Sequence, residues 1–170
     1  MMVKLGDKTK EIDERAMALL KSVFGDIDTL KFPINLDDIL EHCNLTLKEG
    51  SFENDDLAGA LDRDKRTIYI AESDPSWRKN FTIAHELGHF KLHEDVKTDV
   101  FFRYQVKQLM SPVADEHESQ ANWFAASLLM PEKPLKKLRK TFKDVSTLSQ
   151  IFGVSKSAMR YRLKNLSLTK

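Results

Sequence analysis

The chain has 170 residues with 27 Lys+Arg, 26 Asp+Glu and 41% hydrophobic residues, which suits one compact globular domain with a small appendage and excludes a disordered protein. Its single cysteine, Cys43, cannot form an internal disulfide and excludes a cysteine-based zinc finger. No apolar run is long enough to cross a bilayer, and the N-terminal segment lacks the pattern of a signal peptide. We therefore expect a soluble, cytoplasmic protein without membrane association.

The formal net charge of +1 conceals two oppositely charged segments. Residues 1–130 carry 16 Lys+Arg and 24 Asp+Glu, a net of −8, whereas residues 131–170 carry 11 Lys+Arg and 2 Asp+Glu, a net of +9. Pro131 and Pro134 stand at the change of sign, and proline interrupts a helix that arrives from upstream. The sequence thus predicts two parts, an acidic body over residues 1–130 and a basic tail over residues 131–170.

Hydrophobic periodicity and capping residues predict four helices in the body, over residues 7–24, 35–40, 75–93 and 113–130. Between the second and third helix the apolar stretches are short and partly β-branched, which predicts strands near residues 45–47, 57–61 and 67–70. A polar turn joins the last two strands into a hairpin of a small antiparallel sheet. The segment before the fourth helix shows no clear periodicity. The predicted fold class is therefore α+β, a mostly helical protein with a small antiparallel sheet and a small helical C-terminal unit.

The third predicted helix contains the pentad HELGH at residues 85–89, which carries the strongest chemical signal in the chain. Side chains four residues apart on a helix lie about 5–6 Å apart at Cβ, so the imidazoles of His85 and His89 can bind one Zn²⁺ together. The apolar residues of this helix fall on a neighbouring stripe that can anchor it. Glu86 is adjacent but offset, so it can accept a proton from water activated by the metal. For the pentad alone, the alternative is a histidine pair that binds no metal.

A catalytic zinc site needs a third protein ligand and an open fourth position. His93 lies one turn beyond His89, but three successive turns of one helix diverge too far along its axis to meet at one ion. His93 is therefore expected to be structural or to support the ligands. In the elongated form of this motif, a third histidine ligand lies six residues after the pentad, but that position is Asp95 in this chain. On the fourth predicted helix, Glu118 aligns with the apolar stripe, where a carboxylate is unfavourable unless it is paired or binds metal. Glu118 is therefore the predicted third ligand, whereas Glu116 is expected to be a solvated acid.

The segments FTIAHELGHFKLH and ESQANWFAASLLMP, together with the LAGALDRDKRTIYI hairpin before them, resemble the ImmA/IrrE family of bacterial and phage metallopeptidases. The resemblance covers about residues 30–165, and the two motifs in this order are highly specific. It implies a zincin-like fold of the gluzincin type with one zinc ion per chain. It further implies that the zinc ligands are His85, His89 and Glu118, and that Glu86 is the catalytic base.

Other residues near these motifs are candidates for supporting roles. Asn122 matches a polar position of the family and is expected to hold a ligand or the helix packing. A second donor for the oxyanion is usual in such sites, and the sequence does not choose among His93, Tyr104 and His117. For the substrate backbone we expect strand addition at an exposed sheet edge formed by Leu57, Ala58, Gly59 and Ala60.

The basic tail has the pattern of a helix-turn-helix over residues 145–166. A short helix, a glycine turn with Ser155 as the next helix cap, and a second helix with apolar residues at helical spacing are what this unit needs. The second helix would carry the basic side chains Lys156, Arg160, Arg162 and Lys164. These are candidate contacts to nucleic acid or to a protein partner. The alternative is a structural unit that packs on the acidic body.

The resemblance implies a zinc endopeptidase that cleaves a specific protein, a helix-turn-helix repressor encoded nearby, and so relieves repression of a mobile element, a phage or stress genes. Two alternatives stay open. One is a non-catalytic regulator that keeps the fold and binds DNA or a protein, and the other is a toxin–antitoxin module whose partner inhibits it or is cut by it. The intact pentad together with Glu118 favours the enzyme, because a non-catalytic scaffold would be free to lose Glu86.

Overall fold

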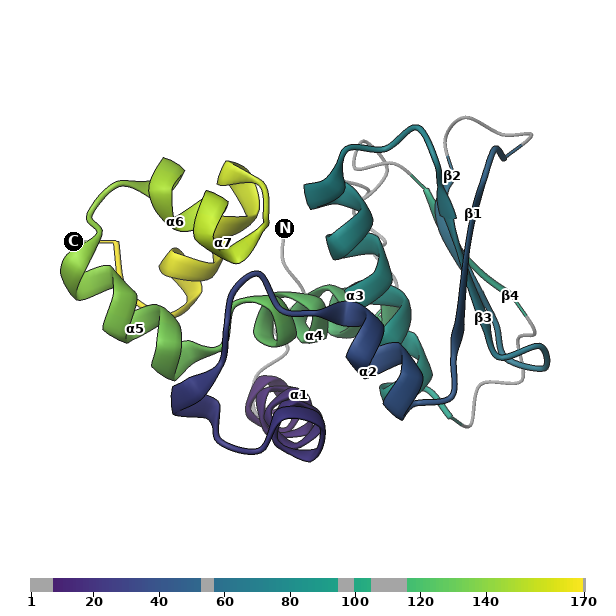
Figure 1. Cartoon of the computed structure of the whole chain (residues 1–170), viewed down its shortest axis with the longest axis horizontal. Coiled ribbons are helices and arrows are strands. Elements are labelled where there is room, and N and C mark those ends of the chain that lie inside the picture. The colour runs from purple at the N-terminus through teal and green to yellow at the C-terminus, as the bar shows by residue number, and fades with distance from the viewer. Residues whose placement is uncertain (1–7, 53–56, 95–99, 105–115, 170) are drawn as a thin grey trace.

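The computed structural model describes residues 8–52, 57–94, 100–104 and 116–169 (Figure 1). The α+β class predicted from the sequence is confirmed, with the sheet at one end of the molecule and the last three helices at the other (Figure 1). None of the described helices is long and apolar enough to span a membrane. The elements in chain order are α1 (Lys8–Phe24), the 3₁₀ helix η1 (Ile27–Thr29), α2 (Leu36–His42), β1 (Thr46–Gly50), β2 (Leu57–Asp62), β3 (Thr67–Ala71), α3 (Ser76–Leu92), β4 (Val100–Tyr104), α4 (Glu116–Leu129), α5 (Glu132–Thr141), α6 (Val145–Phe152) and α7 (Lys156–Asn165).

The four strands form one mixed sheet in the order β1-β3-β2-β4. β2 and β3 form the predicted hairpin, and β4, which the sequence does not predict, pairs antiparallel with β2. β1 runs parallel to β3, so the expectation of a purely antiparallel sheet is wrong for this strand. The reason is topological: β2 lies between β1 and β3 in the sequence and reverses the chain, so β1 and β3 point the same way.

β2 is an internal strand and not the exposed edge expected for substrate binding. Gly59 pairs with Ile70 of β3 on one side and with Arg103 of β4 on the other. Because β2 pairs with β4 from Leu57 and with β3 from Gly59, it is not a free edge, and the expected strand addition at Leu57–Ala60 is wrong. The edges formed by the described strands are β1 and β4.

Helix α3 lies against β2 and β3 and also packs against α4, which is in turn contacted by α1 (Figure 1). The two central helices approach each other closely at Gly88. A Cβ added to Gly88 would lie 3.0 Å from the Cα and 3.1 Å from the carbonyl oxygen of Ala121, tighter than ordinary contact between such atoms. Glycine on α3 and alanine on α4 therefore let the helices approach closely enough for their polar side chains to meet.

The two tail helices α6 and α7 form with the predicted caps. Gly153 ends α6 in the left-handed conformation (φ 65°), and the Ser155 hydroxyl accepts a hydrogen bond from the backbone N–H of Ala158 at 3.1 Å. The sequence does not predict α5, because two prolines read as a break. Pro131 is the N-cap of α5 and Pro134 lies in its first turn. Backbone N–H groups in the first turn of a helix have no acceptor within the helix, so a proline there removes no helical hydrogen bond.

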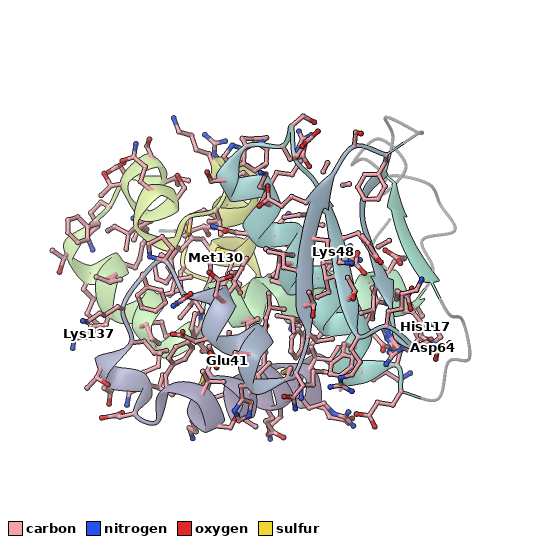
Figure 2. All side chains as sticks on the ribbon, turned by 45° about the vertical axis from the view of Figure 1, so that its right-hand side comes forward. Glu41, Lys48, Asp64, His117, Met130 and Lys137 are labelled. Atoms are coloured by element: carbon pink, nitrogen blue, oxygen red, sulfur yellow. The ribbon has the colours of Figure 1, made fainter. Side chains whose placement is uncertain are left out.

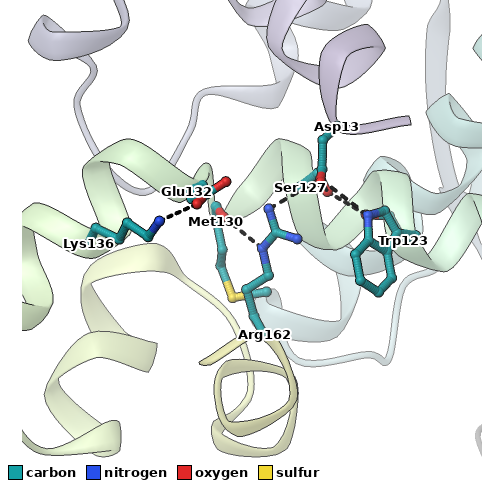
Figure 3. A network of polar contacts seen from close by, with 7 residues as sticks. All are labelled: Asp13, Trp123, Ser127, Met130, Glu132, Lys136 and Arg162. Carbon is teal, nitrogen blue, oxygen red and sulfur yellow. Dashed lines mark hydrogen bonds and ion pairs between the residues drawn. The ribbon is translucent and has the colours of Figure 1, made fainter. Parts of the chain in front are cut away.

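A buried polar network joins α7 to the rest of the protein (Figure 3). The Arg162 side chain is 2% exposed and donates hydrogen bonds to the carbonyl oxygen of Met130 at 3.1 Å and to Asp13 at 3.4 Å. Asp13 also accepts hydrogen bonds from Trp123 and Ser127 of α4 (Figure 3). The prediction of Arg162 as a nucleic-acid or partner contact is therefore wrong, because its guanidinium is enclosed between α1, α4 and α7.

Apolar contacts also cross the predicted boundary between body and tail. One buried hydrophobic cluster includes Leu128 before Pro131 and Leu148 after it. The Asn80 side chain of α3 donates a hydrogen bond to the carbonyl oxygen of Gly153 at 3.1 Å. The division of the chain into two domains at this point stays a prediction.

Candidate metal centre

Three side chains from α3 and α4 converge on one point. His85 and His89 lie one turn apart on α3, Glu118 lies in the first turn of α4, and one ligand atom of each lies within 4.8 Å of the others. The two histidine Nε2 atoms are 3.0 Å apart, and they lie 3.2 and 3.0 Å from the two carboxylate oxygens of Glu118. Ligand atoms around a tetrahedral zinc ion with bonds of about 2.0–2.1 Å are about 3.3–3.4 Å apart. The spacing therefore fits a single ion bound by all three residues.

The neighbour of His85 determines which of its nitrogens can bind a metal. Nδ1 of His85 lies 2.9 Å from the Asn122 side-chain oxygen, which is an acceptor, so Nδ1 carries the proton. A neutral ring then keeps a lone pair on Nε2, facing His89 and the Glu118 carboxylate. Three such groups at 3.0–3.2 Å repel one another unless a cation lies among them, either a metal ion or, in the metal-free protein, protons on the imidazoles. Asn122 thus contacts His85, and its role in holding a ligand or the helix packing stays a prediction.

Glu118 is charged in this environment. Burial raises the pKa of its carboxyl group, but hydrogen bonds and charge interactions with His85 and His89 outweigh burial and hold the pKa well below its ordinary value. A carboxylate must be deprotonated to bind a metal, so Glu118 meets this requirement at neutral pH. Its side chain is 26% exposed whereas both histidines are buried, so Glu118 is the one of the three residues that solvent reaches.

Glu86 is fully buried next to the ligands, at the contact between α3 and β2. A Cβ added to Gly59 of β2 would come within 3.4 Å of the Glu86 Oε1 atom and would overlap the Thr82 methyl group. Gly59 therefore lets the strand approach the helix beside this carboxyl group. Glu86 directly follows His85 in α3 and is not one of the three converging residues, as a proton acceptor requires.

Two of the three oxyanion candidates are described. Nδ1 of His93 lies 3.0 Å from Nδ1 of His89, so His93 is behind that ring and not on its metal-facing side. Burial lowers the pKa of His93 to about 4, so its ring is neutral at neutral pH. His117 packs against His93 with ring centroids 4.4 Å apart and the ring planes inclined at 44°. The side chain of Tyr104 lies outside the described residues, and the oxyanion donor stays a prediction.

The candidate contacts to nucleic acid or to a protein partner lie on the basic tail. Lys156, Arg160 and Lys164 are exposed on α7, in contrast to the buried Arg162. Lys137 of α5 and His117 beside the metal centre lie at opposite ends of the molecule (Figure 2).

The site also uses residues to which the sequence reasoning assigns no role. Arg63, in the β2–β3 turn, donates hydrogen bonds to the carbonyl oxygens of His89 and His93 at the end of α3. Gln120 contacts His93, and Gly59 and Gly88 allow the close approaches described above. The glycines offer a signal, because glycine inside a strand or helix is unfavourable and indicates that another element packs closely. The roles of Arg63 and Gln120 depend on contacts between distant segments.

The fold and the three-residue centre together define an α+β protein of the zincin-like class. A model of the IrrE N-terminal-like domain matches residues 40–164. The chain belongs to this family, the ImmA/IrrE metallopeptidases.

Known relatives show how much of each protein is shared. The chain is 30% identical to the radiation response metalloprotease IrrE of Deinococcus radiodurans over 111 residues, 62% of this chain and 33% of the relative. It is 30% identical to metallopeptidase ImmA of Bacillus subtilis over 114 residues, 64% of this chain and 63% of the relative. It is also 30% identical to the uncharacterized immunity region protein 2 of Bacillus phage phi105 over 114 residues, 66% of this chain and 68% of that protein. The match thus spans a third of the IrrE relative and less than two thirds of the ImmA relative.

A solved structure shares the fold. It is described as a Mycobacterium tuberculosis transcriptional regulator and superposes with a TM-score of 0.67 over 94% of this chain and 49% of that chain. The sequence identity is 17%, so the likeness shows a common architecture only.

Proposed function

We propose that this protein is a zinc-dependent endopeptidase with one zinc ion per chain. The observation that carries the proposal is the convergence of His85, His89 and Glu118 beside the buried Glu86. Two imidazole nitrogens and one carboxylate form a donor set typical of catalytic zinc, with a fourth position open for water or substrate. Membership of a metallopeptidase family supports the same activity.

The chain's own residues supply binding and proton transfer. When bound, zinc contributes Lewis-acid polarisation of water and of the scissile carbonyl group. Glu86 accepts the proton of the attacking water on its carboxylate and passes it to the leaving amine. Asn122 holds the proton on Nδ1 of His85, so that the metal-facing nitrogen keeps its lone pair.

The proposed substrate is a helix-turn-helix repressor encoded near this protein, so that cleavage relieves repression in the cytoplasm. The names of the relatives support a regulatory setting: one is a radiation response metalloprotease and another is an immunity region protein of a phage. Specificity for one protein also accords with a centre whose two histidines and catalytic glutamate are all buried, since only a fitted segment can reach it.

Co-expression with the regulators encoded in neighbouring genes tests the activity and the substrate together. The wild type should contain one zinc per chain and convert one regulator to a fragment whose ends mass spectrometry can define. Glu86→Gln should keep the zinc and lose cleavage, while the exposed control Glu41→Gln should behave as the wild type. Cleavage by Glu86→Gln at the wild-type rate, or a protein that binds no zinc with both histidines intact, would contradict the proposal.

Nucleic-acid binding by the tail is a second candidate function. The observation that favours it is the exposed row of Lys156, Arg160 and Lys164 on the second helix of a helix-turn-helix-like pair. Fluorescence anisotropy with duplex DNA should then show affinity that falls steeply with salt and that weakens in Arg160→Ala. Affinity unchanged by this substitution would assign the tail to protein contacts instead.

A further inference from the structure

We propose that His93 is a positioning residue for the metal ligand His89, and that Glu116 sets the orientation of this pair through Gln120. The inference rests on the metal centre proposed above, and it assigns roles to residues that do not touch the ion. Its basis is a continuous row of hydrogen bonds that runs from the first turn of α4 to the back of His89.

The direction of each hydrogen bond follows from the first acceptor. An ionised Glu116 carboxylate can only accept, so the Gln120 side-chain NH₂ group, 3.0 Å away, donates to it. This orientation turns the Gln120 oxygen towards Nε2 of His93 at 3.1 Å, so that nitrogen must carry the proton. The neutral His93 ring then presents a lone pair on Nδ1, which accepts from Nδ1 of His89 at 3.0 Å.

The consequence reaches the metal-facing atom. With its proton held on Nδ1, His89 keeps the lone pair on Nε2, the atom that lies 3.0 Å from both the His85 Nε2 atom and the Glu118 carboxylate. The two ligands of α3 are thus fixed in the same way by different partners, His85 by Asn122 and His89 by His93. Partners of this kind orient a ligand and raise its basicity, and their loss weakens metal binding about 10- to 100-fold.

His93 lies one turn beyond His89, so its ring can reach that of His89. It is the C-cap of α3, with φ −119° and ψ 45°, and the helix ends at this residue. Arg63 holds this conformation by donating a hydrogen bond to the His93 carbonyl oxygen at 3.0 Å and another to that of His89. A cationic side chain is favourable at the carbonyl end of a helix. At the other end of the row, Lys8 of α1 donates to Glu116.

Two substitutions of nearly equal shape isolate the hydrogen bond. Asparagine carries an acceptor oxygen at the position of the histidine Nδ1 atom, whereas leucine has a methyl group there. In the full-length protein, competition with a chromophoric chelator should give His93→Leu a zinc affinity about 10- to 100-fold below the wild type, with His93→Asn retaining most of the affinity. The exposed control His42→Leu should bind zinc as the wild type does.

The outcomes separate this inference from the proposed function. Wild-type protein that binds no zinc contradicts the metal centre itself. Zinc binding that is equally tight in His93→Leu and wild type, or equally weak in His93→Leu and His93→Asn, overturns the positioning role while the metal centre stands.

A second variant covers the case in which His93→Leu does not fold. Gln120→Leu lies on the partly exposed surface of α4 and leaves every histidine in place. Its circular dichroism should match that of the wild type, and its zinc affinity should fall. An unchanged affinity would overturn the role of Gln120 and Glu116.

Discussion

Gly88→Ala tests whether the contact between α3 and α4 sets the metal centre. The new Cβ would lie 3.0 Å from the Ala121 Cα, against about 3.5–4.0 Å for an ordinary carbon–carbon contact. The helices must therefore separate locally by about 0.5–1 Å. Overpacking of this kind destabilises by about 1–3 kcal/mol, while alanine gains about 1 kcal/mol over glycine in a helix interior. The net change in the free energy of unfolding is small, about 0–2 kcal/mol of destabilisation.

Metal binding should respond more strongly than stability. Glu118 lies one turn before Ala121 on the helix that must move, and metal–ligand distances tolerate changes of only about 0.2 Å. We expect zinc affinity, measured by chelator competition, to fall by at least about tenfold, comparable to the loss of a supporting hydrogen bond. Thermal unfolding of the metal-free protein should show only the small change given above.

Gly50→Ala is the matched control, because a Cβ at that position meets no atom within 4 Å. It should leave zinc affinity unchanged. If Gly88→Ala bound zinc as tightly as the wild type and unfolded at a higher temperature, helix propensity alone would decide the effect, and the inferred close contact would be refuted.

Three further predictions concern the framework. Arg162→Met removes buried hydrogen bonds to a carbonyl and a carboxylate, and it should lower the free energy of unfolding by about 1.5–3 kcal/mol in urea denaturation. Gly59→Ala should lower the melting temperature because its Cβ overlaps the Thr82 methyl group, and the second change Thr82→Ser should restore part of the loss. Hydrogen bonds from the backbone and side chain of Lys65 hold the pKa of Asp62 below its ordinary 3.8. The ionised Asp62 carboxylate therefore stabilises the fold fully above about pH 3.8, and this stabilisation is lost as the pH falls through the lower pKa of the folded state. The difference in melting temperature between wild type and Asp62→Asn should accordingly narrow from neutral pH to about pH 3.

Each of these has an outcome that would contradict it. Equal stability of Arg162→Met and the exposed control Arg160→Met would mean that the buried network does not hold the tail. Failure of Thr82→Ser to improve Gly59→Ala would place the clash elsewhere, for example at the Tyr69 carbonyl oxygen 3.1 Å away. If the difference in melting temperature between wild type and Asp62→Asn did not change with pH, the charge of the Asp62 carboxylate would not be what stabilises the protein.

The convergence of the three residues of the candidate metal centre could be predicted because each follows from local geometry. His85 and His89 are four residues apart on one helix, and Glu118 sits beside an apolar stripe where an unpaired carboxylate is unfavourable. The tail caps at Gly153 and Ser155 are local in the same sense, since each acts within its own turn. Such features need no knowledge of which segments meet in space.

The features that could not be predicted depend on distant contacts. Arg162 reads as a surface residue until Asp13, 149 residues away, is brought beside it. β4 shows no periodicity of its own and forms by pairing with β2, which makes that strand internal. The sequence predicts Glu116 to be a solvated acid, and it is indeed exposed. Its contact with Gln120, however, connects it to His93 at the end of α3.

Zinc K-edge X-ray absorption on the protein loaded with one equivalent of zinc tests the central claim most directly. Two imidazole nitrogens and one carboxylate predict multiple scattering from two rings, nitrogen at about 2.0–2.1 Å and oxygen at about 2.0–2.2 Å. Glu118→Ala should keep the two-ring signature and weaken zinc binding. A spectrum without imidazole scattering, or with a sulfur shell at about 2.3 Å, would contradict a centre made of His85, His89 and Glu118.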